Sequence, residues 1–247
     1  MLRVFAKTSG VALTAQQPYN NIIRSTIHAL AALLGGCQGV FVASFDEALS
    51  IPTDMAATIA ARTSQILIEE TGVADTVDPL GGSYYVESLT GEIEKRAWDY
   101  LNKVEKMGES MKFGSKMLTG VIAGIESGFF EGEIAQTNYR KWKDIESGKR
   151  VIVGVNKYQV EEEIPIQLMK VDMEVQRVKI ERLKDFKQSR NQNEVEEALK
   201  EVEKVAATGE NIMPTLIETA KAKATLGEII NVMKKVFGEY KGVSCSV

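Results

Sequence analysis

The sequence predicts an α/β fold, with two βα units of a parallel sheet in residues 1–89 and a mainly helical extension in residues 90–247. In the first third of the chain, short runs of strand-forming residues alternate with longer segments whose apolar residues recur at helical spacing. This alternation is typical of parallel sheets. Beyond residue 90 helical spacing dominates, and only one further short strand is expected, near residues 151–155.

The first βα unit opens with the run Arg3–Thr8, which predicts a short strand. After a turn, Pro18 suits the first position of a helix, because its fixed φ matches the helix and its missing N–H is not needed there. Apolar spacing then continues to Leu34. The pair Gly35-Gly36 is typical of a helix end.

The second βα unit opens with the run Cys37–Ala43, which is rich in strand formers and nearly free of polar groups, as expected of a strand buried on both faces. A polar turn leads to Pro52-Thr53-Asp54, where a second helix is predicted to start, and Gly72 ends it. A parallel pair of strands leaves two edges unpaired. The sheet is therefore expected to be completed by strands from elsewhere.

The helical extension follows a loop in which Gly81-Gly82 predicts a turn, and a short extended aromatic piece is expected at Tyr84 and Tyr85. Asn193, with Glu196 three residues on, matches a capping box at the start of a later helix. The helices expected from apolar spacing are residues 90–108, 172–186, 193–206 and a terminal helix over residues 214–238.

Composition argues against several classes of function. Thirty basic and 34 acidic residues give a formal net charge of −4, so no field attracts nucleic acid or an anionic membrane. No stretch keeps roughly 18 apolar residues without charge and no signal peptide is visible, so a cytoplasmic location is expected. Cys37 and Cys245 make neither a disulfide framework nor a zinc pair, and the single histidine, His28, has the spacing of a packed or half-exposed helix residue. No metal site is therefore expected.

Several sequence runs, in their order and spacing, resemble one known family. They are TSGVALTAQQPYNN at Thr8–Asn21, FDEAL and IPTD within Phe45–Asp54, DPLGGSYYVE at Asp78–Glu87, VGVNKY at Val153–Tyr158 and GENIMPTLIETAKAKATLGEI at Gly209–Ile229. Together they resemble the C-terminal portion of the large (alpha) subunit of the methylmalonyl-CoA mutase family, whose members are cobalamin-dependent acyl-CoA mutases. Each run alone is a weak signal, whereas the co-linear set is specific.

The resemblance implies the C-terminal part of a (β/α)8 TIM barrel, with an acyl-CoA substrate along the barrel axis and adenosylcobalamin at the carboxyl ends of the strands. It implies an isomerase that performs a radical carbon-skeleton rearrangement of the methylmalonyl-CoA/succinyl-CoA type. Eight βα units take roughly 250 residues, so an upstream barrel half or complementary chain is expected as a partner. His28 is not part of the family's Asp-x-His-x-x-Gly motif. A separate cobalamin-binding small subunit is therefore also expected.

The resemblance places three residues on the substrate side of the site, namely Gln38, Phe5 and Lys7. Gln38 matches a glutamine that contacts the substrate carbonyl, although a buried amide bonded to strand backbone would look the same. Phe5 and Lys7 stand where the family carries a His-x-Gln pair. A lysine inside a barrel needs an anionic partner, which either an acidic substrate group or Glu47 could supply.

Five further positions match places in the family that face adenosylcobalamin, namely Gly10, Ala43, Glu47, Ser50 and Ile51. Glu47 matches a glutamate that accepts hydrogen bonds from the adenosyl ribose, and the alternative is a solvated acid at a helix start. Gly10 matches a glycine close to the corrin, although a turn glycine would look identical. Ser50 replaces the usual alanine, and Ala43 replaces an asparagine. No residue is assigned a catalytic role.

The departures from the family pattern leave alternatives open. Phe5, Phe41 and Val42 make this part of the cavity bulkier and more apolar, which favours a mutase for a different branched acyl-CoA. A truncated, non-catalytic homologue that acts only in assembly is a second alternative. The isolated chain is in any case expected to be inactive without the missing barrel half and the cobalamin subunit. An unrelated phosphate-binding barrel enzyme has no support, because the sequence contains no Gly-rich phosphate loop.

Overall fold

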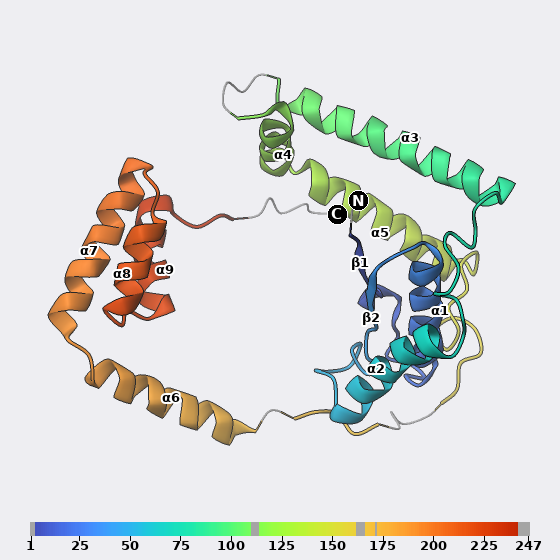
Figure 1. The fold of residues 1–247 in the computed structure, drawn as a ribbon, viewed down its shortest axis with the longest axis horizontal. Helices are drawn as coiled ribbons and strands as arrows, with labels where there is room; N and C mark the ends of the chain where they lie inside the picture. The colour runs from blue at the N-terminus through green and yellow to red at the C-terminus, as the bar shows by residue number, and fades with distance from the viewer. Residues whose placement is uncertain (1–2, 110–113, 162–165, 171, 242–247) are drawn as a thin grey trace. The chain divides into compact units, whose positions relative to one another are not determined.

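A computed structural model describes residues 3–109, 114–161, 166–170 and 172–241. The chain divides into two compact units, an N-terminal unit that extends to Met169 and a C-terminal unit that begins at Lys170 (Figure 1). Each unit is described by itself. Cys245 lies outside the described residues, and Cys37 is a free thiol.

Two βα units open the N-terminal unit, in the predicted order. Strand β1 (Phe5–Lys7) pairs in parallel with β2 (Gly39–Phe41), and the register sets Ala6 opposite Val40. Helix α1 (Asn20–Leu34) connects the strands and α2 (Asp54–Glu69) follows them. The four elements confirm the α/β prediction, although both strands are shorter than the runs of strand-forming residues that predicted them.

The core of the βα pair lies on one side of the sheet. Ala29 of α1 and Ala60 and Leu67 of α2 pack around Val42, which directly follows β2. Phe41 is nevertheless 50% exposed and Phe5 is 70% exposed. The prediction that the second strand is buried on both faces is therefore wrong for the described residues, because two strands with helices on one side leave the other side uncovered.

Three helices continue the N-terminal unit, namely α3 (Tyr84–Met107), α4 (Lys116–Glu126) and α5 (Phe129–Glu146). Tyr84 and Tyr85 form the first turn of α3, so the expected extended piece is wrong. Glu87 accepts a hydrogen bond from the backbone N–H of Gly82 at 3.3 Å, which links the first turn to the preceding loop and favours an early helix start.

Helices α3 and α4 cross where two glycines bring their backbones together. A β-carbon on Gly108 would lie 2.3 Å from the backbone nitrogen of Gly120, and one on Gly120 would lie 2.1 Å from the carbonyl oxygen of Val104. No side chain fits at either position, so the crossing depends on the absence of a β-carbon at both.

The strand expected over residues 151–155 is a turn. Within the described residues its ladder contact is an isolated bridge between Val153 and Lys157. The Asn156 side chain accepts from the Ile152 N–H at 2.7 Å and donates to the carbonyl oxygens of Ile145 and Arg150, each at 2.8 Å. These bonds satisfy backbone groups that would otherwise pair with a neighbouring strand.

Four helices form the C-terminal unit, namely α6 (Met173–Gln188), α7 (Gln192–Thr208), α8 (Met213–Lys221) and α9 (Leu226–Phe237). The residue that caps α7 is Asn191 rather than Asn193, and its side chain accepts from the N–H groups of Asn193 and Glu194. The predicted single terminal helix is two helices. Lys223 has a φ of 67°, which ends the first helix, and Thr225 caps α9 with a capping box. The helix is therefore interrupted although the apolar spacing continues.

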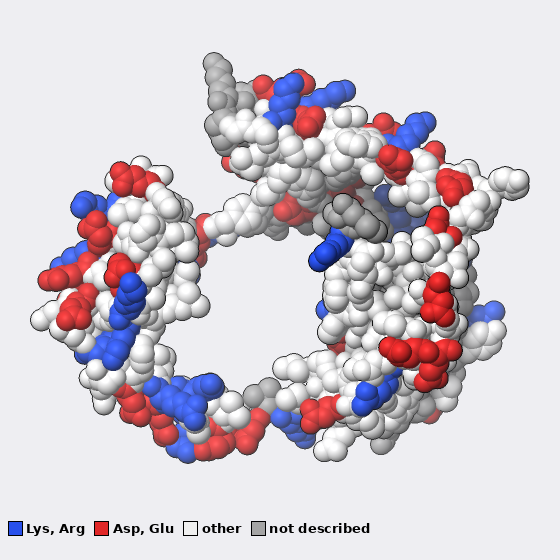
Figure 2. Space-filling view, in the orientation of Figure 1, with Lys and Arg blue, Asp and Glu red and all other residues white. Residues whose placement is uncertain are grey.

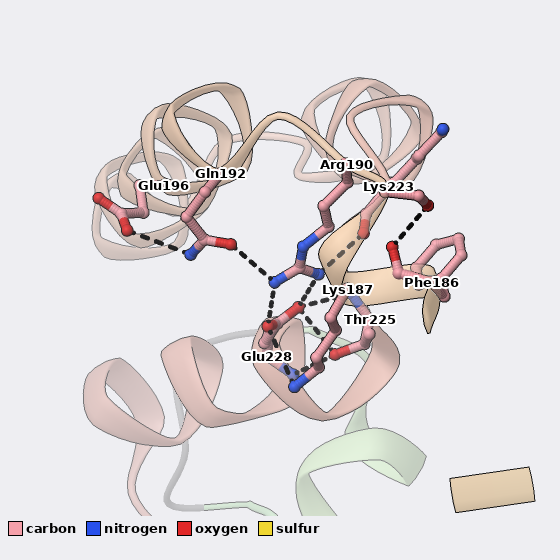
Figure 3. A network of polar contacts seen from close by, with 9 residues as sticks. Phe186, Lys187, Arg190, Gln192, Glu196, Lys223, Thr225 and Glu228 are labelled. Atoms are coloured by element: carbon pink, nitrogen blue, oxygen red, sulfur yellow. Dashed lines mark hydrogen bonds and ion pairs between the residues drawn. The ribbon is translucent and has the colours of Figure 1, made fainter. Parts of the chain in front are cut away.

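One buried ion pair holds the C-terminal unit together (Figure 3). The Arg190 side chain is only 2% exposed and binds Glu228 through two hydrogen bonds of 2.7 and 2.6 Å. Arg190 also donates to the carbonyl oxygen of Lys223 at 3.0 Å, and Thr225 donates to Glu228 through its N–H and hydroxyl groups, each at 2.8 Å. The hydrogen bond from Arg190 is the main reason that the pKa of Glu228 lies far below its usual range.

Charged side chains of both signs are interspersed over helices α6 to α9 on the face shown in Figure 2. No single-sign field gathers there to attract a polyanion. Among the described residues, no helix combines the length and the apolar character that a membrane span requires.

Candidate functional site

The segments that follow β1 and β2 lie side by side, as parallel strands require. Thr8 connects them directly. Its N–H donates to the carbonyl oxygen of Phe41 at 2.9 Å, and its hydroxyl accepts from the N–H of Ala43 at 2.8 Å. The two chain segments therefore leave the sheet at the same edge, where parallel α/β proteins place their functional loops.

Asn21, in the first turn of α1, hydrogen-bonds to both of these segments. Its side chain is fully buried and donates to the carbonyl oxygens of Thr14 and Phe45, each at 2.8 Å. Its carbonyl oxygen accepts from the Thr14 N–H at 3.1 Å and from Arg24 at 2.7 Å. One neutral amide thus fixes the loop after β1 against the segment after β2.

Asp46 fixes the turn that carries the predicted cofactor-facing residues. This side chain is 1% exposed, and one of its oxygens accepts from the N–H and hydroxyl groups of Thr53, at 2.9 and 2.8 Å. Its backbone carbonyl accepts from the N–H groups of Leu49 and Ser50 at 2.8 and 3.1 Å. The turn from Asp46 to Thr53 therefore has a defined shape, set by the cap of α2.

Three predicted site residues meet at this edge, namely Lys7, Gly10 and Glu47. The Lys7 ammonium lies 3.6 Å from the Glu47 carboxylate and 5.3 Å from the centre of the Phe41 ring. A β-carbon on Gly10 would lie 3.3 Å from the same carboxylate oxygen, so a glycine leaves that oxygen accessible. The side chains of Lys7 and Glu47 are 59% and 30% exposed, so their ion pair is worth little to stability.

Gln38 lies at the opposite end of β2 from this cluster. Its side-chain oxygen accepts from the N–H of Val4 and its side-chain nitrogen donates to the carbonyl oxygen of Gly36, both at 2.7 Å. The amide therefore bonds to backbone, which was the alternative to substrate contact. The Gln38 side chain is, however, exposed rather than buried. Phe5 projects from β1 against Gly39 and is also exposed.

The other predicted cofactor positions differ in their access to ligand. Ile51 is exposed, whereas the Ser50 hydroxyl donates to the carbonyl oxygen of Ile51 at 2.9 Å. Ala43 is buried, and its carbonyl oxygen accepts from the Ser25 hydroxyl at 3.2 Å. Ala43 therefore acts within the described residues through its backbone, which holds the segment before Glu47 in place.

Sequence reasoning assigned no role to Thr8, Asn21 or Asp46, which hold the site together. All three lie within or beside the runs that carried the family resemblance, and this is the only sequence signal that marked them. Their hydrogen bonds join residues up to 35 positions apart, and no local pattern reveals such pairings.

The cluster can accept and donate hydrogen bonds through Glu47 and Lys7. His28 is a half-buried residue of α1, as its spacing predicted. Within the described ranges, no group of three or more His, Cys, Asp or Glu side chains is arranged to hold a metal ion. Glu47 beside Gly10 and Lys7 suits a ligand with hydroxyl groups, because a carboxylate accepts strongly from them.

Comparisons with known proteins identify the family of the chain. The family model described as methylmalonyl-CoA mutase matches residues 1–239. The chain is 39% identical to a methylmalonyl-CoA mutase of Rhizobium meliloti over 245 residues, 98% of this chain and 33% of that protein. It is 41% identical to the mitochondrial methylmalonyl-CoA mutase of Mus musculus over 98% of this chain and 31% of that protein. It is 40% identical to the methylmalonyl-CoA mutase large subunit of Porphyromonas gingivalis, again over 98% of this chain and 33% of that protein.

The chain thus spans about a third of the length of these relatives. The family model nevertheless covers both βα units, the helices that follow them and nearly all of the C-terminal unit. The chain belongs to the methylmalonyl-CoA mutase family.

Proposed function

We propose that this chain is the C-terminal part of the catalytic subunit of an adenosylcobalamin-dependent acyl-CoA mutase, an isomerase of the methylmalonyl-CoA/succinyl-CoA type. The observation that carries the proposal is the family match over residues 1–239. In this proposal the two βα units are the last units of a (β/α)8 barrel. The uncovered sheet, with Phe5 and Phe41 exposed, supports it, because further strands would cover them.

The residues at the carboxyl ends of the strands fit the upper side of adenosylcobalamin. Gly10 presents no side chain, and the Glu47 carboxylate stands 3.3 Å from where a β-carbon on Gly10 would be. When bound, the cofactor supplies the carbon-centred radical chemistry that the rearrangement requires. Glu47 would accept hydrogen bonds from ribose hydroxyls, and Ser50 and Ile51 would line the corrin side of the turn that Asp46 fixes.

The substrate side has a different character. Lys7 would place a positive charge beside an acidic acyl group or hold Glu47 in position, since its ammonium already lies 3.6 Å from that carboxylate. Phe5 and Phe41 would exclude water from the reacting carbons. Gln38 would contact substrate only if its amide left the backbone groups of Val4 and Gly36, which it binds in this structure.

Two partners complete the proposal. One is the barrel portion that supplies the remaining strands, from an upstream segment or a complementary chain. The other is a separate cobalamin-binding small subunit. The Porphyromonas gingivalis relative is named a large subunit, which supports this division.

The test is reconstitution of the chain with the complementary barrel portion and the cobalamin subunit, followed by an assay of methylmalonyl-CoA conversion to succinyl-CoA. Turnover supports the proposal, and its absence with both partners present favours a non-catalytic role in assembly. Glu47→Gln should weaken adenosylcobalamin binding about tenfold, since loss of one charged hydrogen bond costs about 1.4 kcal/mol. Glu69→Gln, at the exposed end of α2, is the matched control and should leave binding unchanged.

A mutase for a bulkier branched acyl-CoA is the second candidate. The exposed phenyl rings at Phe5 and Phe41, beside Lys7, favour it, because they make the substrate side more apolar. Competition between methylmalonyl-CoA and larger branched acyl-CoA thioesters in the reconstituted enzyme distinguishes the two. A higher kcat/KM for methylmalonyl-CoA would reject this second candidate.

A further inference from the structure

The VGVNKY turn, one of the motifs shared with the family, packs on the loop between β1 and α1. Gln17 donates through its side chain to the carbonyl oxygen of Tyr158 at 2.9 Å, and Arg24 donates to that of Val153 at 2.8 Å. Gly154, with a φ of 81°, approaches Gln17 so closely that a β-carbon would lie 3.0 Å from the Gln17 side chain. The turn is thus held against this loop by Gln17 and against α1 by Arg24.

A cavity of about 700 Å³ lies between the turn, the β1–α1 loop and α5. This volume is within the range of small-molecule sites, roughly 300–1,000 Å³. Its lining is largely aliphatic, as represented by Val11, Ile145 and Val153. Three cations join the lining, Arg24, Lys141 and Arg150, and no carboxylate does among the described residues.

None of the three cations is paired with a carboxylate in the part of the chain that the structure describes. Arg24 donates instead to neutral oxygens, those of Thr14 at 2.8 Å, Asn21 and Val153. Asp144 lies on the same helix as Lys141 but binds Lys149 at 3.3 Å. Three cations around one cavity repel each other, and partial burial of Arg24 adds a desolvation cost.

We propose that this cavity binds an organic phosphate, with the phosphate group against Arg24, Lys141 and Arg150 and an apolar body against Val11 and Ile145. A dianion offsets the repulsion among the cations, and planar guanidinium groups bind phosphate oxygens well. The aliphatic lining contributes affinity only for a ligand that carries apolar surface. This site is separate from the Lys7, Gly10 and Glu47 cluster and does not depend on mutase activity.

The test is titration of the 247-residue chain with phenyl phosphate, followed by calorimetry and by the backbone amide resonances of Val153 and Gly154. We expect saturable binding that shifts both resonances, and inorganic phosphate should bind at least fivefold more weakly because it has no apolar body. Absence of saturable binding would overturn the proposal, and equal affinities would overturn its apolar half. Competition by a CoA thioester would identify the phosphate as one of the substrate's own, whereas lack of competition would indicate a separate small molecule.

The double variant Lys141→Gln/Arg150→Gln should weaken phenyl phosphate binding at least tenfold. The matched control, Lys95→Gln/Lys143→Gln, removes the same charge from exposed positions of α3 and α5 outside the cavity and should change affinity less than twofold. Equal weakening in both variants would mean diffuse electrostatic attraction and would contradict the site. Both variants alter side chains that hold no hydrogen bond or ion pair in the described structure, so the fold should be retained.

Discussion

The two units of the chain satisfy their buried polar groups in different ways. In the C-terminal unit the buried Arg190 side chain forms an ion pair with Glu228. Arg190 also donates to the carbonyl oxygen of Lys223, and Glu228 accepts from the capping residue Thr225 (Figure 3). The N-terminal unit buries a neutral amide, Asn21, and a carboxylate, Asp46, that has Thr53 rather than a cation as its partner, and it leaves apolar strand residues such as Phe5 uncovered. Both units also expose large apolar side chains, such as Leu226 in the C-terminal unit, so the difference lies in their polar centres rather than in how completely each unit is covered.

This difference indicates where each unit is vulnerable. The junction at Asn21 joins backbone groups and the Arg24 guanidinium, which stays charged at any ordinary pH, so its strength should not change between pH 7 and pH 3.5. The pair in the C-terminal unit depends on an ionised carboxylate. Substitution of Asn21 or Arg190, and a change of pH, should therefore change the stability of the two units differently.

The largest expected effect is that of Asn21→Leu. This change leaves the carbonyl oxygens of Thr14 and Phe45 and the Thr14 N–H without their buried partner, at a cost of about 3–4 kcal/mol. Hydrogen exchange of α1 and α2 peptides, read against α7 to α9 peptides of the same molecule, measures it. Asn20→Leu is the control, because among the described residues the Asn20 side chain bonds to Gln17 alone, at 2.9 Å. Similar losses in the two variants would show that Asn21 is not the centre of the junction.

Arg190→Met should destabilise the C-terminal unit by about 2–3 kcal/mol, because the partly buried Glu228 loses its buried two-hydrogen-bond partner and keeps only the more exposed Lys187, at 3.4 Å. The loss is limited because the Arg190 Nε atom is buried without a hydrogen-bond partner in the described structure, and methionine removes that cost. Faster exchange confined to α7 and α9 is the expected readout. Arg177→Met removes an arginine whose ion pairs on α6 are exposed and should leave those helices unaffected. Unchanged exchange in Arg190→Met would contradict a structural role for the pair.

The smallest expected effect comes from pH. Because the folded state lowers the pKa of Glu228, its contribution is fully present above the ordinary glutamate value of about 4.3 and is lost as pH falls below it. Between pH 7 and pH 3.5 we expect the advantage of the wild type over Glu228→Gln in the C-terminal unit to shrink by about 1 kcal/mol. Exchange or urea unfolding at both pH values measures this. A constant difference would mean that Glu228 acts without its charge.

Much of the fold could be predicted from the sequence, where a local pattern determines the local structure. The pair Gly35-Gly36 identified the end of α1 and Thr53 the start of α2, whereas Pro18 lies two residues before α1 rather than at its first position. The predicted elements were wrong where a side chain hydrogen-bonds to backbone groups that the predicted strand or helix would have paired. Asn156 satisfies backbone groups in the expected strand near residue 153, and Thr225 starts a new helix within a continuous apolar pattern.

The candidate site was predicted less completely. The sequence resemblance identified Lys7, Gly10 and Glu47, which the structure brings together. For Gln38 it left two alternatives open, substrate contact or a bond to strand backbone, and the structure shows the backbone bonds, to the Val4 N–H and the Gly36 carbonyl oxygen. Asn21 was missed, since its bonds reach across 24 residues to Phe45.

The glycine crossing of α3 and α4 has a mechanical consequence. At Gly108 and Gly120 the backbones of the two helices are in direct contact, without a side chain of either residue between them. A force on one helix would pass to the other without first being absorbed by rotamer changes. Helices α3 and α4 should therefore move as one body rather than slide past each other.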